Sequence, residues 1–358
     1  MSNHTDRRRV RYADEEVTQG QMSDLRQEDV IGIFCADIHL TIQAPVWRSV
    51  EPDWMAAQTR PLKELADLQY KFKCPVFCAG DIFDTAKSLP EVINFATDNI
   101  PDNMYAIPGQ HDLPEHQIEQ IHKSAFQSLL NTGAVISIDY RVNIISDCMI
   151  VPFQFGEKLT EAPESAKFKI AIVHEYKWIE GFSFPGAPEA SKIGKRREII
   201  TKHNNPAIIA ECTKKFNKAS GLSNSGFDRN NKYYSYDLIV YGDNHKGFQT
   251  KIGNTIIFNC GTLMRRKSDE INYKPQVGLL TKDFNMIPYY LNTSKDKYLE
   301  VKTEEPEKNL DMSQIITELR KLGKSKLDFA DAVEMYIKAG KASERVIKIL
   351  YKAMKEKS

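Results

Sequence analysis

Short runs of β-branched and aromatic residues alternate with helix-patterned segments from residue 29 onward. The first half of the chain predicts strands at 31–36, 75–80 and 104–109, and helices near 53–72, 89–99 and 115–131. Further buried strands are predicted at 148–153, 168–174, 237–242 and 255–261, with fewer helices between them. This alternation is typical of a buried sheet with helices on its faces. We therefore expect an α/β fold in which a second sheet stacks on the first, giving a two-sheet sandwich flanked by helices.

Three segments depart from this alternation and divide the chain. Residues 1–28 are charged and lack periodicity, which predicts a mobile leader before a main domain at 29–300. An insertion at 178–235 is rich in Gly, Asn, Ser and Lys. Over 190–235, ten Lys or Arg stand against three acids, an excess of +7 in a chain whose formal charge is +1. Residues 301–358 carry three amphipathic helical stretches, which predict a small C-terminal helical appendage.

Composition indicates a cytoplasmic protein, in the host cytoplasm if the source is viral. The hydrophobic content of 41% is enough for a sizeable core. No apolar stretch approaches the roughly 20 residues of a membrane span, and the polar N-terminus lacks the apolar core of a signal peptide. We therefore expect no membrane partner. The six cysteines show no paired zinc spacing, so we expect reduced thiols.

Residues that bind metals or transfer protons follow five of the predicted strands. A lone Asp-x-His or Gly-Asp pair is usually a turn or a cap, but five such groups in order at strand ends are not a chance pattern. Loops at the carboxyl ends of sheet strands are where α/β proteins place their sites. The residues are Asp37 and His39 in CADIHL, Asp81 and Asp84 in AGDIFD, Gln110, His111 and Asp112 in PGQHD, His174 in IVHEY, and Asp243 and His245 in YGDNH.

These residue types suit phosphoryl transfer assisted by metals. The reaction needs charge neutralised on the phosphate oxygens and a nucleophile generated at neutral pH. Mixed carboxylate and imidazole ligands do this with manganese, iron or zinc. A bridging carboxylate can hold two ions about 3.5–4 Å apart for this purpose.

The ordered set DxH, GDxxD, GQHD, VH and GDNH resembles the calcineurin-like metallophosphoesterase superfamily over residues 29–285. Within that superfamily, the chain is most similar to the nuclease subunit of SbcCD-type DNA repair complexes, especially the form found in T-even-like bacteriophages. The strings that carry this closer resemblance are FCADIHL, FCAGDIFD, IPGQHDL and FNCGTLMRR, together with the helical C-terminal appendage.

The resemblance implies two divalent ions and a residue that serves the leaving group. One ion would be bound by Asp37, His39, Asp81 and His245, and the other by Asp81, Gln110, His174 and Asp243, with Asp81 as the bridge. His111 would face the scissile phosphate and donate a proton or hydrogen bond to the leaving oxygen. Asp84 would orient the His111 imidazole.

Two positions depart from the family pattern. The superfamily usually has GNH where this chain has Gly109-Gln110-His111, which moves the amide oxygen one methylene further out. It usually has GHxH where this chain has Gly242-Asp243-Asn244-His245. The extra carboxylate of Asp243 favours a harder ion, manganese or magnesium, over zinc.

The resemblance implies a manganese-dependent DNA nuclease, a 3'-to-5' exonuclease with endonuclease as a further activity, in double-strand-break repair and recombination. Its expected partners are DNA, an SbcC-like coiled-coil ATPase bound through the C-terminal helices, and a second copy of the chain as a homodimer. The basic insertion is either a DNA contact or a solvated loop. Two alternatives stay open: a phosphatase or phosphodiesterase of small substrates, because metal ligands do not encode the substrate, and a DNA-binding scaffold with a degenerate site, suggested by Gln110 and Asp243.

Overall fold

Two mainly parallel sheets form the framework of the main domain. The computed structural model describes residues 25–139, 144–145, 147–163, 166–183, 187–194 and 235–299. The predicted leader lies outside the described residues apart from 25–28. Most of the basic insertion and all of the predicted helices at 301–358 also lie outside them.

The first sheet has the strand order β13-β12-β1-β2-β3-β4. Strands β1 to β4 run parallel to one another, while β12 and β13 are antiparallel to their neighbours. The strands are β1 (Val30–Cys35), β2 (Val76–Cys78), β3 (Met104–Ala106), β4 (Val135–Ser137), β12 (Gln276–Thr281) and β13 (Met286–Tyr290).

The second sheet has the order β10-β11-β9-β6-β5, in which only β10 is antiparallel. A separate pair, β7 and β8, lies outside both sheets. These strands are β5 (Cys148–Phe153), β6 (Phe168–His174), β7 (Trp178–Ile179), β8 (Lys192–Gly194), β9 (Leu238–Gly242), β10 (Phe248–Ile252) and β11 (Thr255–Asn259).

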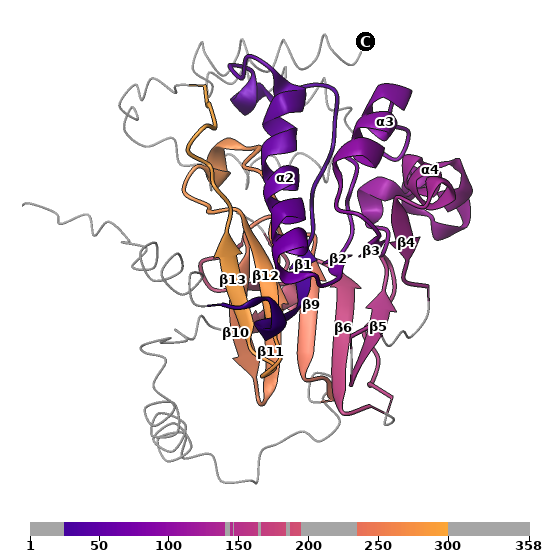
Figure 1. The fold of residues 1–358 in the computed structure, drawn as a ribbon, viewed down its shortest axis with the longest axis vertical. Coiled ribbons are helices and arrows are strands. Elements are labelled where there is room, and N and C mark those ends of the chain that lie inside the picture. Colours follow the sequence, from indigo (N-terminus) through magenta and orange to yellow (C-terminus); the bar gives the residue numbers. More distant parts are fainter. Residues whose placement is uncertain are drawn as a thin grey trace, which may run out of the picture. The chain divides into compact units, whose positions relative to one another are not determined.

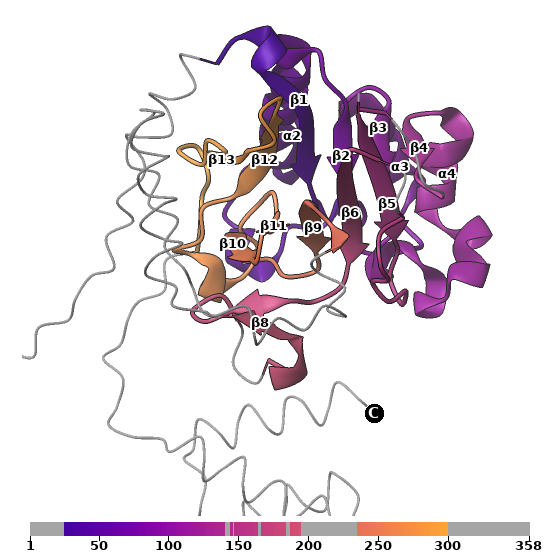
Figure 2. The same ribbon diagram turned by 90° about the horizontal axis from the view of Figure 1, so that it is seen from below.

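The two sheets stack face to face around a shared core, which confirms the predicted sandwich. Phe34, Phe77 and Leu280 of the first sheet pack in one buried cluster with Ile172 and Val240 of the second. Figure 2 shows the two layers, with the helices outside the first sheet. Because the central parallel strands are buried on their outer faces as well as their inner ones, they are continuous apolar runs rather than alternating ones.

Three helices cover the outer face of the first sheet (Figure 1). The Asp53 side chain caps the longest by accepting a hydrogen bond from the Ala56 N–H at 2.9 Å. This helix buries Leu62, Leu65 and Leu68 against the sheet, at the spacing of one helical face. The helices are α2 (Trp54–Phe72), α3 (Pro90–Asn99) and α4 (Ala125–Thr132).

The helix predicted near 115–131 is wrong over its first half. Short 3-10 turns occupy Pro114–His116 and Ile118–Lys123, and α4 begins only at Ala125. Glu115 and His116 have φ values of 54° and 57°, which an α-helix cannot contain. Ser124 then starts α4 by accepting a hydrogen bond from the Gln127 N–H at 3.1 Å.

Two further expectations concern the whole described part of the chain. No helix within the described ranges is long and apolar enough to cross a membrane. The five cysteines that these ranges contain are buried and unpaired with one another.

Candidate metal centre

Five strand ends from the two sheets meet at one place, as the sequence predicts. Strands β1, β2 and β3 end just before the loops that carry Asp37, Asp81 and His111. In the second sheet, β6 ends on His174 itself and β9 ends just before Asp243. Because these strands are parallel, their carboxyl ends lie at the same edge and bring the loops together.

The backbone at this edge is held in an uncommon conformation. Four residues here have left-handed φ values: Asp37 (51°), His39 (52°), Asp81 (58°) and Asp243 (79°). Such angles cost free energy for residues with a Cβ atom and persist only where surrounding contacts enforce them. Here the Asp37 N–H donates to Gly80 O, and the His39 N–H donates to Asp81 O, each at 3.0 Å. Strain concentrated in this way is typical of functional sites.

One group of converging side chains consists of Asp37, His39 and His245, whose nearest nitrogen and oxygen atoms all lie within 4.8 Å of one another. The Nε2 atoms of His39 and His245 are 3.0 Å apart. His39 Nε2 is also 3.9 Å from Asp37 Oδ1 and 3.8 Å from Asp81 Oδ2. The four residues predicted to bind the first ion are therefore together.

A second group consists of Asp37, Asp81 and His174. His174 Nε2 lies 3.4 Å from Asp81 Oδ2. His174 Nδ1 lies 2.6 Å from Ala79 O, and because a carbonyl only accepts, Nδ1 carries the proton and Nε2 faces Asp81. Asp37 belongs to both groups, so it lies between the two clusters in addition to the predicted bridge, Asp81.

Gln110 and Asp243, predicted as ligands of the second ion, lie beside these groups and contact each other. Gln110 Nε2 donates to Asp243 Oδ1 at 2.7 Å. The Asp243 N–H donates to both carboxylate oxygens of Asp37 at 3.1 Å. Among the described residues, Asp243 is in neither of these groups, nor in a third that consists of His39, Asp84 and His111.

Buried atoms without hydrogen-bond partners show that this donor set fits divalent ions. Asp81 Oδ2, His174 Nε2 and Gln110 Oε1 are buried and accept no hydrogen bond in the described part of the chain. Leaving buried polar atoms unpartnered costs about 1–3 kcal/mol each. Carboxylate and imidazole ligands suit manganese, iron or zinc, and such an ion would satisfy these atoms.

The pKa values reflect carboxylates crowded in a buried site. Burial raises the pKa of Asp37 to about 7, with a further contribution from the neighbouring Asp81 and Asp243. Burial opposes charge on His174 as well, but the carboxylates of Asp81 and Asp37 raise its pKa well above the ordinary value. Burial lowers the pKa of His39. The site therefore holds excess negative charge that either protons or cations must neutralise.

His111 lies at the rim of the centre. Its N–H donates to Asp81 Oδ1 at 2.8 Å, and its ring packs edge-on against His39 with centroids 4.9 Å apart. Its Nδ1 is 2.9 Å from the backbone carbonyl of Asp84. The contact between Asp84 and the imidazole is therefore made by the main chain of Asp84. The Asp84 carboxylate instead accepts from Arg266 at 2.7 Å and lies 3.6 Å from His39 Nδ1.

Glu270 contacts one of the predicted ligands, His245, and no sequence motif predicted it. Glu270 is buried, and its carboxylate lies 3.0 Å from His245 Nδ1. It also accepts from the N–H groups of Arg266 at 2.6 Å and Lys267 at 3.0 Å. Burial raises the pKa of Glu270, but His245 and these N–H donors outweigh burial and hold the pKa below its ordinary value. The carboxylate is therefore ionised. The only sequence signal was a polar RRKSDE run after β11.

Asp112 joins the two loops that carry Asp81 and His111. Its carboxylate accepts from the N–H groups of Ile82 (3.3 Å), Phe83 (3.0 Å) and Gly109 (3.0 Å). The side chain is fully buried, and burial raises its pKa to about 7. Asp112 therefore has a structural role beside the centre.

Comparison with known proteins identifies the family. The sequence matches the family model of calcineurin-like phosphoesterases from residue 33 to residue 247, which is more than half of the chain. No curated protein sequence matches the chain.

Solved structures that resemble the chain are distant. They include a novel archaeal phosphodiesterase (12% identity, 73% of this chain and 99% of that chain, TM-score 0.34). A metallophosphoesterase from Sphaerobacter thermophilus is 12% identical over 83% of this chain and 96% of its own, with a TM-score of 0.32. Vacuolar Protein Sorting 29 from Cryptosporidium parvum is 14% identical over 76% and 95%, with a TM-score of 0.31. Likeness at this level says nothing about a substrate.

The family match begins inside β1 and ends two residues after His245, so it contains all five strand ends. The converging Asp and His side chains lie within the same span. This chain belongs to the calcineurin-like phosphoesterase family and is a phosphoester hydrolase.

Proposed function

We propose that this chain is a manganese-dependent DNA nuclease that hydrolyses phosphodiester bonds. The observation that carries the proposal is the pair of side-chain groups that share Asp37, with His111 beside them at the rim. When bound, two divalent ions supply Lewis acidity toward phosphate oxygens and lower the pKa of water. Asp37, His39, Asp81, His174 and His245 would hold them, and the unpartnered Gln110 Oε1 offers a further ligand atom.

His111 is the residue placed to serve the leaving oxygen. Because its Nδ1–H donates to the carbonyl of Asp84, its Nε2 is the ring atom left to face the leaving oxygen, and it gives a proton or hydrogen bond there when the imidazole carries a proton on both nitrogens. The Asp81 carboxylate fixes the His111 backbone, so the imidazole is held in position before substrate arrives. Positioned proton donors of this kind contribute about 10²–10⁴-fold to rate.

DNA as the substrate and manganese as the ion are supported by the motif strings shared with SbcCD-type nucleases and by the local charge. Arg266, Lys267 and Lys87 lie near the centre, and such side chains contact phosphates whatever the base sequence. The backbone N–H of Asp243 contacts Asp37, and the additional carboxylate of Asp243 beside the centre favours a hard ion. An SbcC-like ATPase and a second copy of the chain are proposed partners on the same resemblance, and the 301–358 segment lies outside the described residues.

A phosphatase or phosphodiesterase of small substrates is the second candidate. A pocket of about 370 Å³ adjoins His111, which suits one small molecule rather than a duplex. The ligand set is the same for both candidates, so substrate preference has to be measured.

The test is cleavage of end-labelled duplex DNA in manganese by the wild type, His111→Ala and the control His122→Ala. His122 is exposed and bonds to Glu119 O, away from the centre. We expect His111→Ala to cleave at least about 100-fold more slowly while retaining manganese binding in calorimetry, and His122→Ala to match the wild type. Cleavage of bis(p-nitrophenyl) phosphate but not DNA would favour the small-substrate enzyme. Equal residual DNA cleavage in wild type and His111→Ala would overturn the nuclease proposal.

A further inference from the structure

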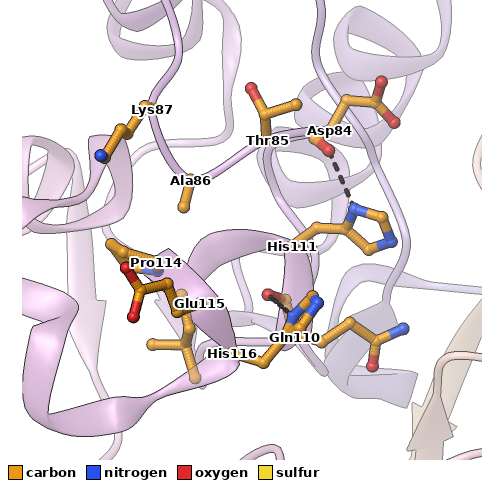
Figure 3. Close-up of a pocket in the computed structure, with 10 residues that line it drawn as sticks. Asp84, Thr85, Ala86, Lys87, Gln110, His111, Pro114, Glu115 and His116 are labelled. Carbon is orange, nitrogen blue, oxygen red and sulfur yellow. Dashed lines mark hydrogen bonds between the residues drawn. The ribbon is translucent and has the colours of Figure 1, made fainter. Parts of the chain in front are cut away.

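A pocket of about 370 Å³ lies between the loop after β2 and the loop after β3, and its lining includes His111, whose ring packs against His39 of the metal centre. Figure 3 shows Ala86 and Lys87 of the first loop facing Pro114, Glu115 and His116 of the second. A volume of this size is near the lower end of the roughly 300–1,000 Å³ typical of small-molecule sites.

The pocket walls are held in place without a ligand. Asp112 ties the two loops together through three main-chain N–H groups. The Ala86 carbonyl accepts from the Ala125 N–H at the start of α4, at 2.7 Å. Leu113 and Pro114 are buried behind the pocket and give it an apolar wall. A group that enters therefore meets a preformed surface, which lowers the ordering cost of binding.

His116 presents a defined ring atom at the pocket. Its Nδ1 lies 2.9 Å from the Gln110 carbonyl, so Nδ1 carries the proton and the ring orientation is fixed. The left-handed backbone at Glu115 and His116 turns both residues to the pocket side, at a conformational cost that the loop contacts must offset. The second ring nitrogen, Nε2, is left to contact an occupant.

The charges around the pocket nearly cancel. Lys87 and Glu115 carry opposite charges on the rim, and the Asp84 carboxylate is neutralised by Arg266 at 2.7 Å. A pocket with so little net charge would not attract a second phosphate strongly. A neutral ring with polar edges could pack on the apolar wall and form hydrogen bonds with the polar side chains.

We propose that this pocket binds the nucleoside attached to the leaving oxygen of the phosphodiester. The inference rests on the proposed function, because it gives the leaving group of that reaction a place beside His111. His116, Lys87 and Thr85 provide polar contacts to the sugar and base, and Ala86, Leu113 and Pro114 provide the apolar contact. The pocket thereby favours nucleoside phosphodiesters over other diesters.

The test compares thymidylyl-thymidine with bis(p-nitrophenyl) phosphate in manganese. Two variants alter the pocket, His116→Ala by removing a contact and Ala86→Leu by filling the space. His122→Ala is the matched control, since its exposed imidazole also bonds to a backbone carbonyl but lies outside the pocket. The ratio of kcat/KM for the dinucleotide to kcat/KM for the aryl diester should fall about tenfold in both pocket variants and stay within about twofold in the control.

Binding of free thymidine, measured by saturation-transfer NMR, separates failure of the inference from failure of the proposed function. We expect a thymidine signal with the wild type and with His122→Ala, and a much weaker one with Ala86→Leu, whether or not either diester is cleaved. If neither diester is cleaved, the proposed function fails and the thymidine result alone decides the pocket. An unchanged substrate ratio in both pocket variants, or thymidine binding equal in Ala86→Leu and wild type, would overturn the inference.

Discussion

Asp37 is the residue at which protons and metal ions compete. Its pKa of about 7 lies above the ordinary value of 3.8, because burial and neighbouring carboxylates oppose its charge. A raised pKa in the folded state stabilises the metal-free protein fully below about pH 4, and this contribution is lost as the pH rises through about 7. Metal binding needs the opposite protonation state.

Manganese affinity should therefore rise steeply with pH up to about pH 7, where Asp37 loses its proton. His174, whose pKa the carboxylates raise, must also lose a proton to bind an ion, which adds to the same trend. We expect at least about a tenfold loss of affinity for each pH unit below 7. Calorimetry at several pH values, in buffers of different ionisation enthalpy, measures both the affinity and the protons released. Constant affinity between about pH 5.5 and 7 would show that these groups bind without deprotonation.

At the scale of elements, the loop between β11 and β12 supports two ligands from one side. Glu270 contacts His245 Nδ1, and Arg266 contacts the Asp84 carboxylate that lies beside His39. Partners of this kind orient metal-binding imidazoles, and their loss typically costs about 10–100-fold in affinity.

Glu270→Gln should weaken manganese binding about tenfold or more, because an amide cannot accept from His245 and two N–H groups as a carboxylate does. Glu119→Gln, at an exposed position on another loop, is the control. Calorimetry gives the affinity, and the thermal midpoint measured in a chelator shows whether folding has changed. A variant that binds manganese as tightly as the wild type would mean that Glu270 stabilises only its own loop.

Elements with a continuous apolar signal could be predicted from the sequence, and those set by tertiary contacts could not. The runs at 148–153 and 168–174 are strands over the predicted residues, and the first helix begins within one residue of its predicted start. The interrupted start of α4 depends on the backbone of Glu115 and His116, which the helical pattern hides. The unpredicted strands are β4, β7, β8, β10, β12 and β13, most of which are short or lie at a sheet edge.

The metal centre, like the fold, could be predicted from the sequence only in part. Parallel strands fix which loops share an edge, so the sequence placed Asp37, Asp81, His174 and His245 together. It could not place Glu270, because contact with His245 across 25 residues depends on how the loop after β11 folds. A motif also does not encode the two contacts of Asp84. Its backbone carbonyl accepts from His111, and its carboxylate accepts from Arg266.

At the scale of the whole molecule, the metal centre lies where the two sheets meet. Asp37, His39 and Asp81 come from the first sheet, and His174 and His245 come from the second. Without an ion, buried carboxylates from both layers repel one another, and buried polar atoms stay unpartnered. An ion that binds only the folded state adds stability according to its concentration relative to Kd, about 2.7 kcal/mol at 100 Kd.

Manganese should therefore raise the thermal midpoint of the chelator-treated protein by about 5 °C or more at saturation, as expected from about 2–4 °C per kcal/mol for domains near this size. Asp81→Asn should lose most of this shift, because it removes a carboxylate that lies 3.8 Å from His39 and 3.4 Å from His174. Asp67→Asn, an exposed carboxylate on α2, should keep it. Differential scanning fluorimetry across a manganese titration measures all three proteins. An equal shift in Asp81→Asn and wild type would place the stabilising ion elsewhere. The Asp81 carboxylate lies between His39 of the first sheet and His174 of the second, so an ion bound by both sheets needs it.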